Sequence, residues 1–137
     1  MKRSIFFAIL ALALAVSALA AEHPQKPGQW EMTMQMDMPG MPVKLPPFKH
    51  TMCITAEDLK DPQKSVPSDP KSKCTISDYK IDGNKVTWTM ECPKQKMKGE
   101  GEATYTADSF TATTHLTMED REMTVKYSGK WKGECQK

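Results

Sequence analysis

Methionine side chains near the start of the folded part are the residues whose type and spacing could bind a metal. Five of them lie between positions 32 and 41, and Met52 follows with His50 two residues before it. Thioethers are soft ligands that select Cu(I), which an exported protein would meet. As a copper site, the chain offers Met36, Met38, Met41, Met52 and His50.

Core packing is the other explanation of the same methionines, and it is the one we favour. Alternate residues of a strand share one face, so Met32, Met34 and Met36 would point together into a core, where the flexible thioether fills irregular space. Only Met38 and Met41, beside a Pro-Gly turn, escape this explanation. They form a candidate tip for contact with a ligand or partner. We therefore expect no cofactor, with copper as the alternative.

Cysteine is the second residue type with possible chemistry. Cys53, Cys74, Cys92 and Cys135 make an even number, which in an exported domain of this size favours two disulfides. The register given below places Cys74 opposite Cys92 and leaves Cys53 for Cys135. A strict meander would put Cys53 and Cys135 at opposite ends of the sheet, so Cys53–Cys74 with Cys92–Cys135 stays open. The spacings differ from those of C-x-x-C redox or zinc pairs, which favours a structural role.

Signatures of catalysis are missing from the sequence. The three histidines, His23, His50 and His115, stand in no metal-ligand spacing, and there is no nucleophile elbow or phosphate-binding loop. Glu100 and Glu102 share one strand face, where a pair of carboxylates is typical of a solvated surface. We expect no catalytic residue and a protein that is not an enzyme.

The N-terminus has the three parts of a secretory signal. Lys2 and Arg3 precede an apolar run over 5–16, and the small residues that follow predict cleavage after Ala20. The remaining 21–137 would be a single periplasmic β-domain with no membrane span. Its charge is 17 basic minus 17 acidic residues, which is zero, so it has no electrostatic footprint for nucleic acid.

The elements that must position these residues are mainly strands. Alternation predicts one strand from about Gln29 through Met36 and another through Phe48 and Ile54. A capping box at Thr55 predicts one short helix to about Lys60, and three prolines make 61–73 a loop. Five further strands are expected at 74–82, 85–92, 97–106, 109–118 and 122–132. The prediction is an antiparallel β-meander that curls into a barrel-like or half-closed sheet; an open sheet covered by the helix and the proline loop is the alternative.

Four successive hairpins have a register that the structure can test. Gly83-Asn84 suits a type II′ turn, which places Ile81 opposite Val86 and Tyr79 opposite Trp88. One bulge at Ser77-Asp78 then sets Ile76 against Met90 and Cys74 against Cys92. Farther along, Trp88 should cover Gly101, Met90 should face Gly99, and Tyr105 should face Phe110. Phe110 is expected to face Trp131 in the last hairpin.

This register produces a cross-strand row of mostly small residues, Val86, Ala103, Ala112 and Gly129. Close packing by another element would fill the space above it, and this is the explanation we favour. The alternative is a cavity for an apolar ligand.

Several segments together have a familiar pattern. They are Pro27–Glu31, Met36–Pro42, Cys53–Glu57, Lys73-Cys74 with Asp78–Lys80, Val86–Trp88 with Cys92, and Tyr127–Gly129 with Gly133–Cys135. In these segments the chain resembles an exported bacterial family catalogued as domain of unknown function 3617. The resemblance implies a small periplasmic β-domain and transfers no catalytic or binding residue. We expect a non-catalytic binding or envelope-associated module whose partner is a small apolar molecule or another envelope protein.

Overall fold

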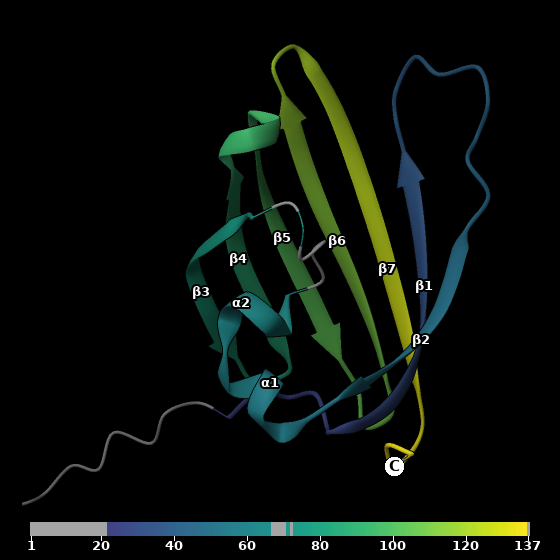
Figure 1. Ribbon diagram of the computed structural model, residues 1–137, viewed down its shortest axis with the longest axis vertical. Helices are drawn as coiled ribbons and strands as arrows, with labels where there is room; N and C mark the ends of the chain where they lie inside the picture. Colours follow the sequence, from purple (N-terminus) through teal and green to yellow (C-terminus); the bar gives the residue numbers. More distant parts are fainter. Residues whose placement is uncertain (1–21, 67–70, 72, 137) are drawn as a thin grey trace, which may run out of the picture.

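Seven strands make up most of the computed structural model, which describes residues 22–66, 71 and 73–136 (Figure 1). The predicted cleavage after Ala20 lies outside the described residues. In chain order the elements are β1 (Gly28–Asp37), β2 (Phe48–Ile54), α1 (Ala56–Lys60), α2 (Pro62–Ser65), β3 (Thr75–Asp82), β4 (Lys85–Cys92), the 3-10 turn η1 (Pro93–Gln95), β5 (Met97–Tyr105), β6 (Ser109–Met118) and β7 (Arg121–Gly133).

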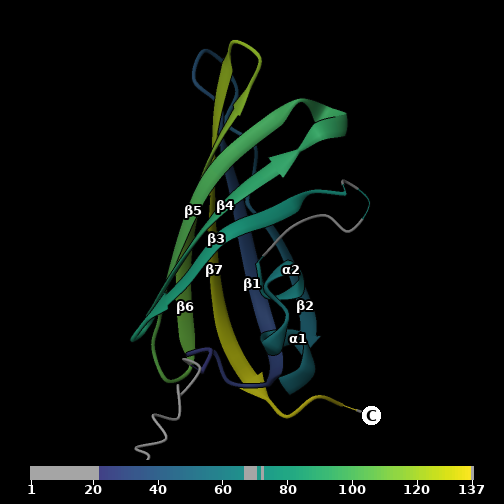
Figure 2. The same cartoon turned by 90° about the vertical axis from the view of Figure 1, so that its left-hand side faces the viewer.

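The strands form one antiparallel sheet in the order β2-β1-β7-β6-β5-β4-β3. The mainly β prediction is confirmed, and β3 to β7 form the expected meander. A strict meander through all strands is wrong, because β1 pairs with β7 and β2 lies outside it. The long connection between β2 and β3 lets β3 occupy the opposite edge. Because the edge strands β2 and β3 do not pair with each other, the sheet is not closed; it twists and curls, and both helices lie on one side of it (Figure 2).

The connection after β2 contains two short helices rather than one. The Thr55 side chain accepts from the amide of Asp58 at 3.2 Å, and the Asp58 carboxylate accepts from the amide of Thr55 at 3.0 Å, as the capping box predicts. The prediction of a loop from Asp61 onward is wrong over Pro62–Ser65, which form α2. The Asp61 side chain caps α2, and Pro62 stands in the first turn, where its missing N–H and fixed φ favour a helix.

The β3–β4 hairpin follows the predicted register with one displacement. A two-residue turn joins the strands, with φ +58° at Gly83, and Ile81 pairs with Val86 and Ile76 with Met90. The bulge lies one residue later than predicted, because Asp78 and Tyr79 together oppose Trp88. Asp78 adopts φ +49°, a left-handed conformation that aspartate tolerates better than most residues.

The last hairpin differs from the prediction by two residues. β6 and β7 are joined by a tight turn in which Met118 pairs with Arg121, so Phe110 faces Gly129 and not Trp131. The predicted row of small residues is therefore wrong at its end, because Ala112 pairs with Tyr127. Gly129 is required where it lies, since a Cβ atom there would collide with the Phe110 ring.

The core lies on the side of the sheet toward which the strands curl. Trp88 pairs with Gly101 as predicted, and its indole fills the space where a side chain at that glycine would be. The buried apolar residues are Trp30, Met32, Val66, Ile76, Val86, Trp88, Met90, Cys92, Ala103, Tyr105, Phe110, Ala112, Leu116 and Val125. Val66, the residue that follows α2, belongs to this set, so the end of α2 is fixed to the core of the sheet.

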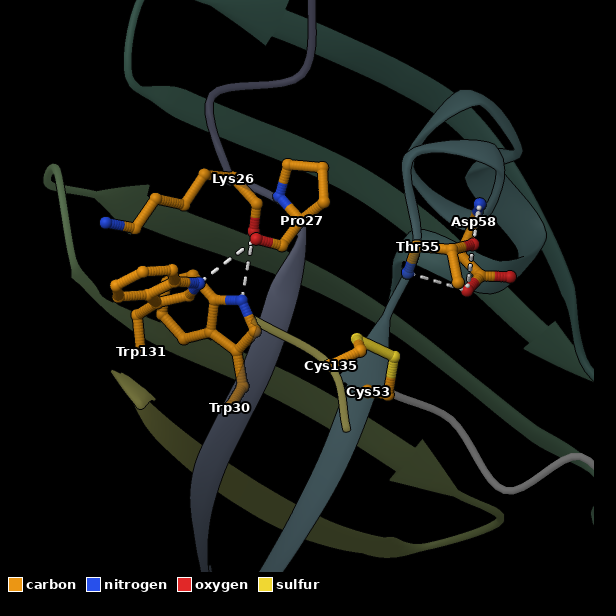
Figure 3. Close-up of a disulfide and its surroundings, with 8 residues drawn as sticks. All are labelled: Lys26, Pro27, Trp30, Cys53, Thr55, Asp58, Trp131 and Cys135. Atoms are coloured by element: carbon orange, nitrogen blue, oxygen red, sulfur yellow. Dashed lines mark hydrogen bonds between the residues drawn. A yellow bond between two sulfur atoms is a disulfide. The ribbon is translucent and has the colours of Figure 1, made fainter. Parts of the chain in front are cut away.

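The structure contains two disulfides, Cys74–Cys92 and Cys53–Cys135. The first follows from the β3–β4 register. The second becomes possible through β1, because Gln29 pairs with Cys53 on one side and with Gly133 on the other. Cys53 and Cys135 thus lie at the same end of the sheet, with 5.5 Å between their Cα atoms (Figure 3).

Candidate ligand-binding cavity

A cavity of about 630 Å³ lies between the N-terminal strands and the two helices. This volume is within the range of small-molecule sites, which are concave and mostly apolar. Its lining residues are Gln25, Met32, Met34, Phe48, His50, Met52, Cys53, Ile54, Asp58, Gln63, Lys64, Ser65, Val66, Tyr105, Phe110 and Tyr127.

Strands β1 and β2 supply the apolar wall. Directly opposed residues of an antiparallel pair point to the same side, and here Met32 pairs with His50 and Met34 with Phe48. Because β2 is an edge strand, its side chains are only partly covered: Phe48 is 58% exposed and Met52 42%. These two side chains form an apolar rim.

The helical wall supplies polar groups that are already hydrogen-bonded within the fold. The Gln63 amide donates to the carbonyl oxygen of Ile76 at 3.0 Å and accepts from its N–H at 3.2 Å, which fixes α2 to β3. The Ser65 and Tyr79 hydroxyls lie 3.1 Å apart. Hydrogen bonds from Thr55 hold the pKa of Asp58 below its usual value. These groups are occupied in positioning the helices.

Two tyrosines complete the cavity from the sheet. Tyr105 packs against Phe110, with 5.3 Å between ring centroids, and Tyr127 pairs with Met34 across the β1–β7 ladder. Burial raises the pKa of both phenols. They therefore stay protonated at neutral pH and act as uncharged walls.

The segment before β1 is held in place by two tryptophans. Trp30 Nε1 donates to the carbonyl oxygen of Lys26 and Trp131 Nε1 to that of Pro27, both at 3.0 Å, and the Lys26 ammonium lies 3.6 Å from the centroid of the Trp131 ring (Figure 3). This anchoring brings Gln25, which is only 4% exposed, to the cavity.

His23, which lies in this segment, is half-buried. Its Nδ1 accepts a hydrogen bond from the backbone N–H of Gln25 at 3.1 Å, and its ring lies edge-on to Tyr105 with 5.1 Å between centroids. Burial lowers the pKa of His23 to about 4. The ring is therefore neutral at pH 7.

The residues that the sequence proposed as copper ligands do not form one group. Met52 and His50 line the large cavity, whereas Met36, Met38 and Met41 line a separate one of about 190 Å³ inside the β1–β2 loop. Among the described residues, no three His, Cys, Asp or Glu side chains come together as a metal site. At the tip, Met41 is 47% exposed, as expected for a residue outside the core.

The small-residue row does not line the cavity. Val86, Ala103 and Ala112 are buried, and the open space lies beside them, over Phe110 and Tyr127. Gln25 is a lining residue that sequence reasoning missed. Its segment has no periodic pattern, so nothing in the sequence marks it as inward-facing.

Comparisons with known proteins identify the family. The model of the family described as "Protein of unknown function (DUF3617)" matches residues 25–135, so the chain belongs to this family and the resemblance seen in the sequence is confirmed. No curated protein and no solved structure matches the chain. Within the described residues, no helix has the length and apolar character needed to cross a membrane.

Proposed function

We propose that this member of the DUF3617 family is an exported, non-catalytic binding module that holds a small apolar molecule in the cavity between β1, β2 and the two helices. The observation that carries the proposal is the cavity itself, about 630 Å³ with methionine and aromatic walls. Methionine suits such a site, because its flexible thioether adapts to ligands of different shape.

The state of the polar groups around the cavity supports binding rather than catalysis. Asp58, Gln63 and Ser65 form hydrogen bonds that hold the helices, and burial keeps Tyr105 and Tyr127 protonated. A general base or nucleophile needs a pKa near the working pH and a partner positioned to activate it. Asp58, Gln63 and Ser65 instead hold the helices in place through their hydrogen bonds.

Two disulfides support the exported part of the proposal. Such bonds form and persist in oxidising compartments. Together with the signal-like N-terminus of the sequence, they favour a periplasmic location.

Titration with a neutral apolar dye, N-phenyl-1-naphthylamine, tests the proposal. We expect saturable binding of one dye per chain with enhanced fluorescence. Met34→Trp places a larger side chain in the cavity and should abolish binding. Gln35→Trp adds the same bulk on the exposed side of the same strand and should leave binding unchanged. Absence of dye binding by the native protein, or equal loss in both variants, would contradict the proposal.

A further inference from the structure

Gln25 has an unusual environment for a polar side chain. It is 4% exposed, it lines the large cavity, and its Nε2 atom is buried without a hydrogen-bond partner among the described residues. Leaving a buried amide unpaired is unfavourable, and native proteins rarely do so without a reason.

The fold gives no use for this amide. The segment that carries Gln25 is held through the backbone carbonyls of Lys26 and Pro27, which accept hydrogen bonds from the two tryptophans. The Gln25 backbone N–H donates to His23 Nδ1, and this bond is independent of the side chain. An apolar residue of the same length would satisfy all of these contacts.

The missing partner is therefore a ligand atom that accepts a hydrogen bond. Gln25 lines the cavity, so a ligand held there can offer an acceptor to this nitrogen. The Gln25 amide carries no charge that could balance a buried carboxylate, so the acceptor that we assign to it is an uncharged oxygen. The apolar walls on either side require an apolar body.

We infer that the cavity takes an acyl ester whose carbonyl oxygen accepts a hydrogen bond from Gln25 Nε2, while its hydrocarbon chain lies along Met32, Met34 and Phe110. This inference rests on the proposed function and adds the chemical class of the ligand. The source of the ester, a glycerolipid or a simple alkyl ester, does not alter the contact.

Displacement of bound N-phenyl-1-naphthylamine by three compounds tests the inference. Methyl decanoate supplies the ester, tridecane supplies hydrocarbon of equal heavy-atom number, and decanoate supplies a carboxylate. The variant is Gln25→Met, which keeps an unbranched side chain and removes the amide. We expect this variant to bind methyl decanoate about 3- to 10-fold more weakly, which is the effect of one hydrogen bond, and to bind tridecane with unchanged affinity.

The matched control is Gln29→Met, because Gln29 does not line the cavity. This control variant should change the affinity for neither methyl decanoate nor tridecane. Urea unfolding without ligand separates an anchoring role from a structural one: Gln25→Met should be at least as stable as the native protein, and Gln25→Leu should repeat the result.

Three outcomes would overturn the inference without contradicting the proposed function. They are an equal loss of affinity for methyl decanoate and tridecane in Gln25→Met, tighter binding of decanoate than of methyl decanoate, and marked destabilisation of both Gln25 variants. Failure of the dye itself to bind the native protein would overturn the proposed function and this inference with it.

Discussion

Replacing Cys53 and Cys135 together by alanine should remove about 4.5 kcal/mol from the free energy of unfolding. The bridge joins residues 82 positions apart, and closing a loop of that length lowers the entropy of the unfolded chain by this amount in the chain-entropy model. Cys53 is exposed and Cys135 half-buried, so the substitutions open no cavity in the core. The measured loss should therefore report the cross-link itself.

Urea unfolding followed by tryptophan fluorescence is the suitable assay. The variant should show a lower midpoint and a larger dependence on urea, because its unfolded chain is more expanded. Thr51→Ala/Gln136→Ala changes exposed neighbours on the same two segments and should shift stability by less than about 0.5 kcal/mol. The expected loss is easy to measure, since the total stability of a domain is only about 5–15 kcal/mol. A loss below about 1 kcal/mol in the double cysteine variant would refute the reasoning.

Three further predictions concern other parts of the molecule. Stability should fall as the pH drops from about 6.5 toward 4, because His23 takes up a proton at its ordinary pKa of 6.5 in the unfolded chain but only at about 4 in the folded chain. His23→Gln should reduce this pH dependence in urea titrations at pH 7 and 4.5. An unchanged pH dependence in the variant would contradict the assignment to His23. Gly129→Ala should cost about 1–3 kcal/mol through collision with the ring that covers it, whereas Ser128→Ala, on the exposed face, should be neutral in the same urea assay; equal stability of the two variants would contradict the register. Met38→Leu/Met41→Leu should leave anaerobic Cu(I) titrations unchanged, because these thioethers lie in a different cavity from Met52; a tight site that disappears in the double variant would favour the copper hypothesis instead.

The local parts of the fold were accessible from the sequence because their signals are short-range. The Gly83-Asn84 turn, the Thr55 capping box and the Trp88–Gly101 pair each depend on residues within one hairpin or one helical turn. The error at Trp131 has a local cause too. The tight β6–β7 turn contains no glycine, and Glu119 takes the φ of +54° that such a turn more often gives to glycine.

The long-range parts were not accessible in the same way. No residue of β1 indicates that it pairs with β7, and the position of Cys53 beside Cys135 follows only from that pairing. The cavity depends on the same arrangement, since β1 and β2 form its wall. The resemblance supplied the family but no site, and Gln25 could be recognised only once its surroundings were known.

The place of β1 between β2 and β7 also has a consequence for how the protein is made. Strand β1 pairs with β7, the last strand of the chain, so the sheet cannot be completed until almost the whole chain has been synthesised. Pairings between such distant segments form slowly, since a long loop must close before any contact rewards it. The pairing of β1 with β7 is therefore a late step of folding, whereas the hairpins from β3 to β7 join strands that are neighbours in the chain. That order of folding is compatible with the proposed export of the chain, which would have to precede completion of the sheet.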